Sequence, residues 1–377
     1  PGLGVFYAGM VRKKNVLSTI MHSFFLLALI TVQWVLAGYT LSFGPDLGGL
    51  IGGLDFLGLG GVGVEPKGTV PHLLFMAFQG MFAAITVALI TGAFAERIKF
   101  SAVVVFSLLW VFIVYDPLCH WVWGGGWLQK LGVLDFAGGI VVHISSGVSA
   151  LVAAIYIGRR RGWPRELMAP HNLTLTVMGM GILWFGWFGF NAGSALASDG
   201  VAVTAFVSTN VSAAVGTLTW GFIEWAHRGK PTLLGAMSGA VAGLGSITPA
   251  AGFVTPAAAM AIGLVGGGLC YVAVTMLKPR FGYDDTLDVF GIHGIAGTWG
   301  TLATGIFASI GASGLLHGNP GLLLKQAIGA SVTIVLSAAG TLAILKVVDM
   351  TIGIRVTTEE EIQGLDLTQH EESGYTM

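Results

Sequence analysis

Two histidines stand inside apolar stretches of this sequence, and each follows an aspartate at the start of its stretch. One stretch runs from Asp135 through Phe-Ala-Gly-Gly-Ile-Val-Val to His143, and the other runs from Asp288 through Val-Phe-Gly-Ile to His293. A helix rises about 1.5 Å per residue, so His143 would lie about 12 Å beyond Asp135. Because an ionisable side chain in hydrocarbon is costly, such a histidine is expected to have a function and a polar partner. We therefore predict that His143 and His293 are partners in one site.

The composition indicates which solvent surrounds the chain. Of 377 residues, 54% are hydrophobic and only 10% are charged, and the mean hydropathy is +0.80. A chain with so few charged residues could not cover the surface of a water-soluble domain, and we therefore predict an all-α polytopic membrane protein. The 58 glycines would allow its helices to pack closely. The formal net charge of −1 gives no reason to expect a nucleic-acid partner. Cys119 and Cys270 lack the spacing of metal ligands, and we expect neither a metal nor a cofactor.

Hydrophobic segments of the roughly 20 residues needed to cross a bilayer recur along the chain. The segment before Arg12 is shorter, and we expect it to be part of an incomplete first helix. Together with ten full spans it predicts eleven transmembrane helices in a domain of residues 1–350, followed by a polar tail at 351–377. The ten spans are 16–43, 72–95, 100–118, 136–158, 173–196, 201–226, 233–252, 256–277, 289–310 and 322–349.

Lysines and arginines are divided very unequally between the two sides that these spans predict. Fifteen of the 18 fall in alternate loops or the tail, and only Lys67, Lys130 and Lys325 fall on the opposite side. Because cytoplasmic loops carry an excess of Lys and Arg, the richer side and the carboxyl terminus are predicted to be cytoplasmic.

This orientation makes the helices of His143 and His293 run in opposite directions. Each is the fifth helix of a five-helix unit, the first unit covering approximately residues 1–158 and the second 173–310, and a final helix follows at 322–349. Matching helices of opposite direction are typical of an inverted repeat, whose site lies near the bilayer midplane between the units. We therefore expect a five-plus-five inverted repeat around the two histidines.

Aromatic residues gather in segments that would lie toward the outside. Phe78 and Phe82 are four residues apart and share one helical face. Trp123 lies in an outer loop, and Ser194 follows the aromatic segment 184–190. Trp123, Phe82 and Ser194 could line one vestibule that suits a small cation with protons to donate, since cation–π attraction contributes up to about 2 kcal/mol when the cation is desolvated.

These residues also have structural interpretations. A phenylalanine pair at helical spacing more often packs than gates, and a buried histidine is often structural. That alternative is weaker for His143 and His293, because both lie deep in apolar spans at equivalent places. Asp135 and Asp288 are more simply explained as helix caps, since a carboxylate there meets unpaired N–H groups and the positive end of the helix dipole.

Several segments together resemble the ammonium transporter family (Amt/Mep/Rh), and its bacterial and archaeal Amt branch most closely, over nearly the whole chain. Their number and order make this resemblance far more specific than a single motif. It implies an eleven-helix protomer, a homotrimer with one pore per subunit, and conduction of ammonium across the cell membrane. The matching segments are Phe6–Asn15, Ala95–Arg97, Trp123–Gly126, Asp135–His143, Trp187–Ser194, Thr248–Gly252, Asp288–His293 and Gly364–Asp366.

The same resemblance implies roles for the outer aromatic residues. Trp123, Phe82 and Ser194 match the external site that recruits the cation, and Phe78 joins that vestibule. Phe82 and Phe190 match a pair of stacked rings that gates the pore.

Deeper in the membrane, the resemblance implies a pore around the two imidazoles. His143 and His293 match the twin pore histidines of the family, Trp187 packs nearby, and Thr248 lines the pore. Asp135 matches a structural aspartate. The tail would be a cytoplasmic regulatory segment that contacts neighbouring subunits and offers a surface to a PII-type signal protein.

The sequence therefore predicts selective transport of ammonium or ammonia through a hydrophobic pore, with recruitment outside, deprotonation, and passage along the histidine pair. The alternative is an ammonium sensor of Amt type that signals through a separate partner, since no effector domain follows the tail. An intramembrane hydrolase is disfavoured because the chain has no His-Glu-x-x-His motif and no evident nucleophile with a base beside it.

Overall fold

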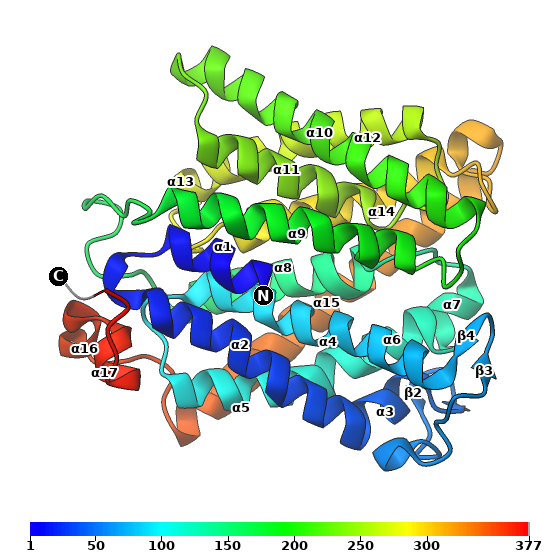
Figure 1. Cartoon of the computed structure of the whole chain (residues 1–377), viewed down its shortest axis with the longest axis horizontal. Coiled ribbons are helices and arrows are strands. Elements are labelled where there is room, and N and C mark those ends of the chain that lie inside the picture. Colours follow the sequence, from blue (N-terminus) through cyan, green and yellow to red (C-terminus); the bar gives the residue numbers. More distant parts are fainter. Residues whose placement is uncertain (376–377) are drawn as a thin grey trace.

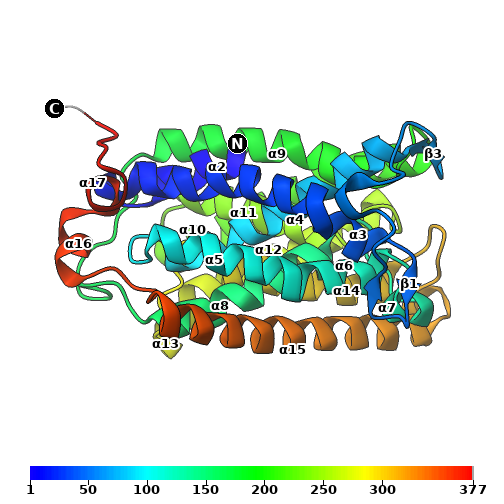
Figure 2. The same ribbon diagram turned by 90° about the horizontal axis from the view of Figure 1, so that it is seen from below.

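The computed structural model describes residues 1–375 as a bundle of helices that mostly run along one axis (Figures 1 and 2). The prediction of a mostly helical chain is confirmed. The helices are α1 (Gly2–Met10), α2 (Val16–Gln33), α3 (Tyr39–Phe43), α4 (His72–Phe94), α5 (Phe100–Trp110), α6 (Asp116–Trp123), α7 (Trp127–Leu131), α8 (Ser145–Ile157), α9 (Leu173–Gly193), α10 (Gly200–Arg228), α11 (Leu233–Ile247), α12 (Pro256–Val272), α13 (Lys278–Phe281), α14 (Ile295–Phe307), α15 (Pro320–Thr351), α16 (Thr358–Gln363) and α17 (Leu365–His370).

Wider π-helical turns join some of these helices into longer rods. Trp34–Gly38 joins α2 to α3, and Val111–Tyr115 joins α5 to α6. The third span therefore continues beyond the predicted residue 118, and Trp123, which we expected in a loop, is the last residue of α6. Further π turns at Gly139–Ile144 and Phe290–Gly294 lead into α8 and α14.

Two short antiparallel hairpins close the end of the bundle that lies opposite α16 and α17 (Figure 2). Strand β1 (Asp46–Leu47) pairs with β2 (Ile51–Gly52), and β3 (Pro66–Lys67) pairs with β4 (Val70–Pro71). The fold is thus helical with a small amount of sheet in the connection between α3 and α4.

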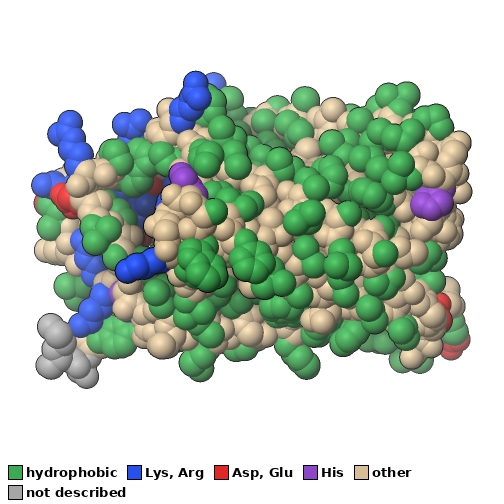
Figure 3. Space-filling view, turned by 90° about the horizontal axis from the view of Figure 1, so that it is seen from above, with side chains coloured by type: hydrophobic (Ala, Val, Ile, Leu, Met, Phe, Trp, Pro, Cys, Tyr) green, Lys and Arg blue, Asp and Glu red, His purple; other side chains and the backbone are tan. Residues whose placement is uncertain are grey.

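The surface of the bundle is suited to lipid along its length. Within residues 1–375, eight helices are long and apolar enough to cross a membrane, and Leu233–Ile247 is a shorter apolar helix. In Figure 3 hydrophobic side chains cover the body of the molecule, whereas Lys and Arg gather at one end. This distribution agrees with the unequal division of basic residues in the sequence.

The described part of the polar tail is folded back on the bundle. Helices α16 and α17 pack beside the start of α2 (Figure 1). An Asp366 oxygen accepts a hydrogen bond from the Ser18 N–H at 2.8 Å, and Glu361 accepts one from the Arg161 N–H at 2.6 Å. Partners more than 190 residues distant therefore hold the tail, and local composition could not indicate them.

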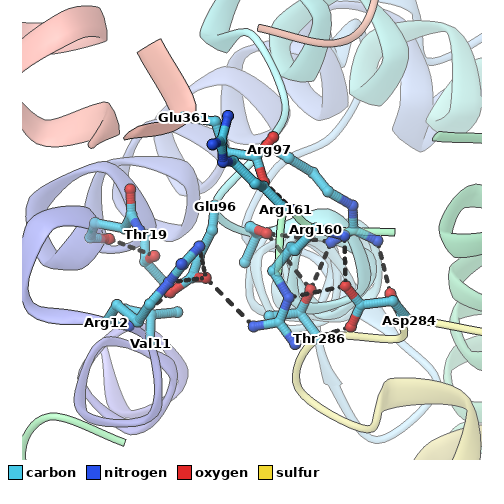
Figure 4. Close-up of polar contacts among 12 residues, drawn as sticks. Val11, Arg12, Thr19, Glu96, Arg97, Arg160, Arg161, Asp284, Thr286 and Glu361 are labelled. Carbon is cyan, nitrogen blue, oxygen red and sulfur yellow. Dashed lines mark hydrogen bonds and ion pairs between the residues drawn. The ribbon is translucent and has the colours of Figure 1, made fainter. Parts of the chain in front are cut away.

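A buried charge cluster ties several loops together at the basic end (Figure 4). Arg160 bonds both carboxylate oxygens of Asp284 at 2.8–2.9 Å and also pairs with Glu96, which binds Arg12 as well. Arg97 lies beside them and donates to the Asp284 carbonyl at 2.6 Å. Burial alone would raise the pKa of Asp284, but its bonds with Arg160 and that charge hold the pKa below its ordinary value.

We expect Asp284→Asn to lower the free energy of unfolding by about 3–5 kcal/mol, because it leaves the buried Arg160 without its carboxylate. A depressed carboxyl pKa stabilises the fold above the ordinary Asp pKa, so the difference from wild type should shrink as the pH falls below about 4. Thermal unfolding in detergent at several pH values measures this. Asp199→Asn is the matched control, since Asp199 is an exposed cap of α10 and asparagine also caps. Equal stability of the two variants would contradict the prediction.

Candidate functional site

The two histidine rings predicted to be partners lie edge to edge in the middle of the bundle. Their Nδ1 atoms are 3.2 Å apart, the ring centroids are 5.2 Å apart, and the planes differ by 15°. His143 is 1% exposed and His293 is 5% exposed. At this distance one Nδ1 donates a hydrogen bond and the other accepts it, so the pair shares one proton between two rings.

The Asp135 carboxylate fixes the start of the helix that carries His143. Its two oxygens accept hydrogen bonds from four consecutive N–H groups, those of residues 138–141, at 2.7–3.0 Å. This matches the helix cap that the sequence predicted, because the carboxylate replaces water for N–H groups that have no partner within the helix.

The corresponding cap before His293 is Asp285, and the prediction of Asp288 was wrong. Asp285 accepts a hydrogen bond from the Phe290 N–H at 2.8 Å, whereas Asp288 pairs with Lys278 and has a φ of 60°. Asp285 precedes His293 by eight residues, the same interval that separates Asp135 from His143. That equal spacing was the signal in the sequence that could have found Asp285.

Glycines allow the two histidine segments to approach closely. A side-chain carbon added at Gly147 would overlap the backbone of Gly294, the residue after His293. One added at Gly297 would come within 2.8 Å of both the Gly139 carbonyl oxygen and the His143 side chain. The short distance between the rings therefore depends on backbones that touch without side chains between them.

Trp187 of α9 forms a wall of the site beside His143. The two rings are stacked, with centroids 5.4 Å apart and planes 15° apart. The indole N–H donates to the Thr248 hydroxyl at 2.9 Å, and that hydroxyl donates to the Leu244 carbonyl at 2.8 Å. The two predicted pore residues Trp187 and Thr248 are thus brought together, and the hydrogen bonds prevent the indole from turning.

The predicted vestibule residues also lie together, on the side of the histidine pair where Phe190 contacts His143. The rings of Phe82 and Phe190 are stacked at 4.3 Å, and Phe190 lies 6.2 Å from the His143 ring. Phe78 and Trp123 contact the Phe82 ring at 4.9 and 5.6 Å. The Trp123 indole is held by a 2.8 Å hydrogen bond to the Asp135 carbonyl, so the vestibule and the helix cap are directly connected.

Ser194 ends α9 near these rings and places one hydroxyl group there. The hydroxyl donates to the Phe190 carbonyl at 2.8 Å, which leaves its oxygen lone pairs available as acceptors. Gly193 packs against the Phe78 ring, since an added side-chain carbon would meet that ring at 3.1 Å. The end of α9 that carries this hydroxyl therefore packs against Phe78, one of the aromatic residues that the sequence grouped with Ser194.

An apolar groove of about 510 Å³ borders the histidine pair and is open to the surface at Phe24, beside the first residues of the sequence. Side chains of α1, α2, α4 and α9 line it, among them Leu3, Phe24, Ile85 and Trp187. Such a lining offers few groups that could replace the water shell of an ion. The surroundings of the imidazoles are therefore hostile to a bare charge.

Comparisons with known proteins identify the family. A sequence model of the Ammonium Transporter Family matches residues 1–375. The chain belongs to the ammonium transporter family. This confirms the resemblance seen in the sequence, and with its apolar helices it makes the chain a multi-pass membrane protein.

Curated relatives in this family are similar along the whole chain. The ammonium transporter of Bacillus subtilis (strain 168) is 54% identical over 383 residues, covering all of this chain and 94% of the relative. Ammonium transporter Amt1 of Archaeoglobus fulgidus is 51% identical over 380 residues, covering all of this chain and 95% of the relative. The names of these relatives describe transporters rather than enzymes.

Solved structures of the family have the same fold. Candida albicans Mep2 superimposes with a TM-score of 0.92 at 36% identity, covering 100% of this chain and 89% of that one. A sensor Amt protein gives a TM-score of 0.92 at 30% identity, covering 98% of this chain and 94% of that one. The fold is therefore shared with Mep2 and with a protein named as a sensor.

We expect Gly147→Ala to destabilise this ammonium transporter family member by about 1–3 kcal/mol, because the added methyl group overlaps Gly294 and forces the histidine segments apart. Thermal unfolding of the purified protein measures the stability, and a crystal or cryo-EM structure of the variant measures the separation of the rings. Gly181→Ala is the control, since an added carbon there meets nothing within 4 Å. A Gly147→Ala protein with wild-type stability and ring separation would show that the close approach is unimportant.

Proposed function

We propose that this protein transports ammonium or ammonia selectively across the membrane through a pore that contains the twin histidines. The observation that supports this most directly is the continuous series of side chains from Trp123 through the Phe82–Phe190 stack to His143 and His293. The series begins with aromatic faces and a hydroxyl acceptor and ends with two buried imidazoles in apolar surroundings. The names of the curated relatives support the same substrate.

Selectivity follows from the cost of dehydrating a cation. Moving a bare cation into an apolar passage costs several kcal/mol or more. A potassium ion cannot lose its charge, whereas ammonium can pass as neutral ammonia with its proton handled separately. We propose that Trp123, Phe78, Phe82 and Ser194 recruit the cation, and that the Phe82–Phe190 stack gates its entry.

The histidine pair gives the departing proton and the ammonia molecule hydrogen-bonding partners. The His143–His293 contact joins two groups whose unperturbed pKa is near neutrality, and each ring nitrogen can donate or accept. Within the described residues, His143 Nε2 has no hydrogen-bond partner and remains free for ammonia. Trp187, held by Thr248, forms a wall beside His143, and Asp135 positions His143 without contacting the substrate.

The placement of this pore in the cell completes the proposal. We propose eleven crossings within residues 1–350, built as a five-plus-five inverted repeat of residues 1–158 and 173–310 with a final helix at 322–349. The equal Asp-to-His intervals of eight residues support the repeat. The basic end would face the cytoplasm of the cell, with the tail at 351–377 on that side. Family membership supports a homotrimer and a surface for a PII-type signal protein.

The sensor alternative has less support than transport. Curated relatives at 51–54% identity are named as transporters, while the sensor Amt protein is 30% identical in sequence to this chain. Uptake of ammonium by transporter-deficient cells that express this protein would separate the two roles. Growth at limiting ammonium supports transport, and expression without uptake would favour a sensor.

We expect His143→Ala or His293→Ala to abolish ammonium flux or its selectivity over potassium, because one half of the shared hydrogen bond is lost. Currents across proteoliposomes in ammonium and potassium gradients measure both quantities. An ammonium current from the wild-type protein would show that the proton crosses, whereas ammonia entry without current would indicate a neutral channel. His317→Ala, at an outer loop, is the control. Unchanged flux and selectivity in both pore variants would rule out the proposed role of the pair.

We expect Ser194→Ala to weaken recruitment at low ammonium and to leave saturated flux nearly unchanged, because one acceptor of about 1 kcal/mol is lost. That corresponds to roughly a fivefold rise in half-saturating concentration. Uptake measured over a range of ammonium concentrations tests this. A change confined to maximal flux would contradict an outer recruitment role.

A further inference from the structure

A second cluster of aromatic rings in the outer connection encloses the side chain of Lys67. Its amine lies 4.8 Å from the Phe75 ring centroid and 5.3–5.5 Å from those of Tyr39, Phe43 and Phe56. These rings come from α3, from the loop before residue 57, and from α4. The Lys67 amine, which β3 carries, therefore lies in a cage of aromatic rings that come from separate segments of the chain.

The cage binds Lys67 as a cation. The amine donates to the Tyr39 hydroxyl at 3.0 Å, and that hydroxyl is 2.5 Å from His72 Nε2. Burial lowers the pKa of Lys67 to about 8, so most of the amine remains charged at pH 7. Among the described residues the ion pairs do not include Lys67, so the aromatic faces are what attract its charge.

The tip of the same hairpin contacts the end of α9. The Thr69 hydroxyl donates to the Leu196 carbonyl at 2.6 Å. Leu196 has a φ of 54°, a left-handed conformation that is unfavourable for a leucine and that needs support from its surroundings. Its N–H bonds the Gly193 carbonyl at 2.9 Å, so this turn directly terminates the helix that carries Ser194.

We propose that the β3–β4 hairpin is a clamp for the outer end of α9, and that Lys67 and Thr69 are positioning residues for Ser194. The cage fixes the hairpin, and the hairpin fixes the strained turn two residues after the serine. The substrate-affinity part of this inference rests on the proposed ammonium transport, whereas the clamp itself does not.

The clamp is tested by the exposure of the turn in the full-length protein. Ala195→Cys places a thiol between Ser194 and Leu196, and the two natural cysteines are buried. We expect Thr69→Val and Lys67→Met each to increase the maleimide labelling rate of that thiol severalfold, and Lys67→Arg to restore it toward the parent rate. If Lys67→Met fails to fold, Thr69→Val still decides, since Thr69 is exposed. Unchanged labelling in Thr69→Val would overturn the clamp.

Matched controls separate the clamp from general loosening. Lys130→Met removes another outer lysine, which pairs with Asp46 in a different hairpin. Thr31→Val removes a threonine hydrogen bond within α2. We expect both controls to label at the parent rate, and an increase in both as large as in Thr69→Val would overturn the clamp.

The effect on the substrate is read from ammonium uptake. We expect Thr69→Val and Lys67→Met to raise the half-saturating ammonium concentration severalfold with little change in maximal flux, and Lys67→Arg to reverse the effect. An unchanged half-saturation despite faster labelling would overturn the positioning of Ser194. If the wild-type protein transports no ammonium at all, the proposed function is wrong, but the maleimide labelling rates still test whether the hairpin clamps the end of α9.

Discussion

The four hydrogen bonds that Asp135 accepts are the interaction on which the rest of the site depends. A helix that begins inside a membrane protein exposes N–H groups that no water can satisfy, and this carboxylate satisfies them within 2.7–3.0 Å. The cap fixes where the helix starts and so where His143 lies. Through its carbonyl, the same residue also holds the Trp123 indole. The side chain and the backbone carbonyl of this one residue thereby set the relative positions of the vestibule rings and the histidines.

Small residues complete this arrangement because they permit contact where any side chain would separate the helices. Gly147 against Gly294 and Gly297 against Gly139 bring the two histidine segments together at the centre of the bundle. Lipid gives helices no hydrophobic reason to associate, so close packing and hydrogen bonds must supply the attraction. At the basic end, Arg160 and Asp284 supply it through a buried ion pair. Close glycine packing at the centre of the bundle and the buried ion pair at its basic end therefore both hold the helices in place.

Much of the site could be predicted because its signals are local. His143 and His293 stand out as polar residues in apolar runs, and the family motifs supply the rest. The choice between Asp285 and Asp288 could have been made from the eight-residue interval that Asp285 shares with Asp135, but the left-handed backbone of Asp288 and its pairing with Lys278 are visible only in the structure. The docked tail and the Lys67 cage were also missed. Their partners lie on distant segments, and no spacing rule connects such segments.

The π-helical turns at Gly139–Ile144 and Phe290–Gly294 have a consequence for how this protein tolerates change in length. Each turn accommodates an extra residue without opening the ladder of backbone hydrogen bonds, which a membrane would penalise. Removing one residue there would restore an ordinary helix but rotate everything after it by about 100° around the axis. A shortened chain would therefore remain helical, but its imidazoles would no longer face each other or the aromatic residues as they do here. The two π-helical turns therefore set the rotation of the histidine side chains about their helix axes.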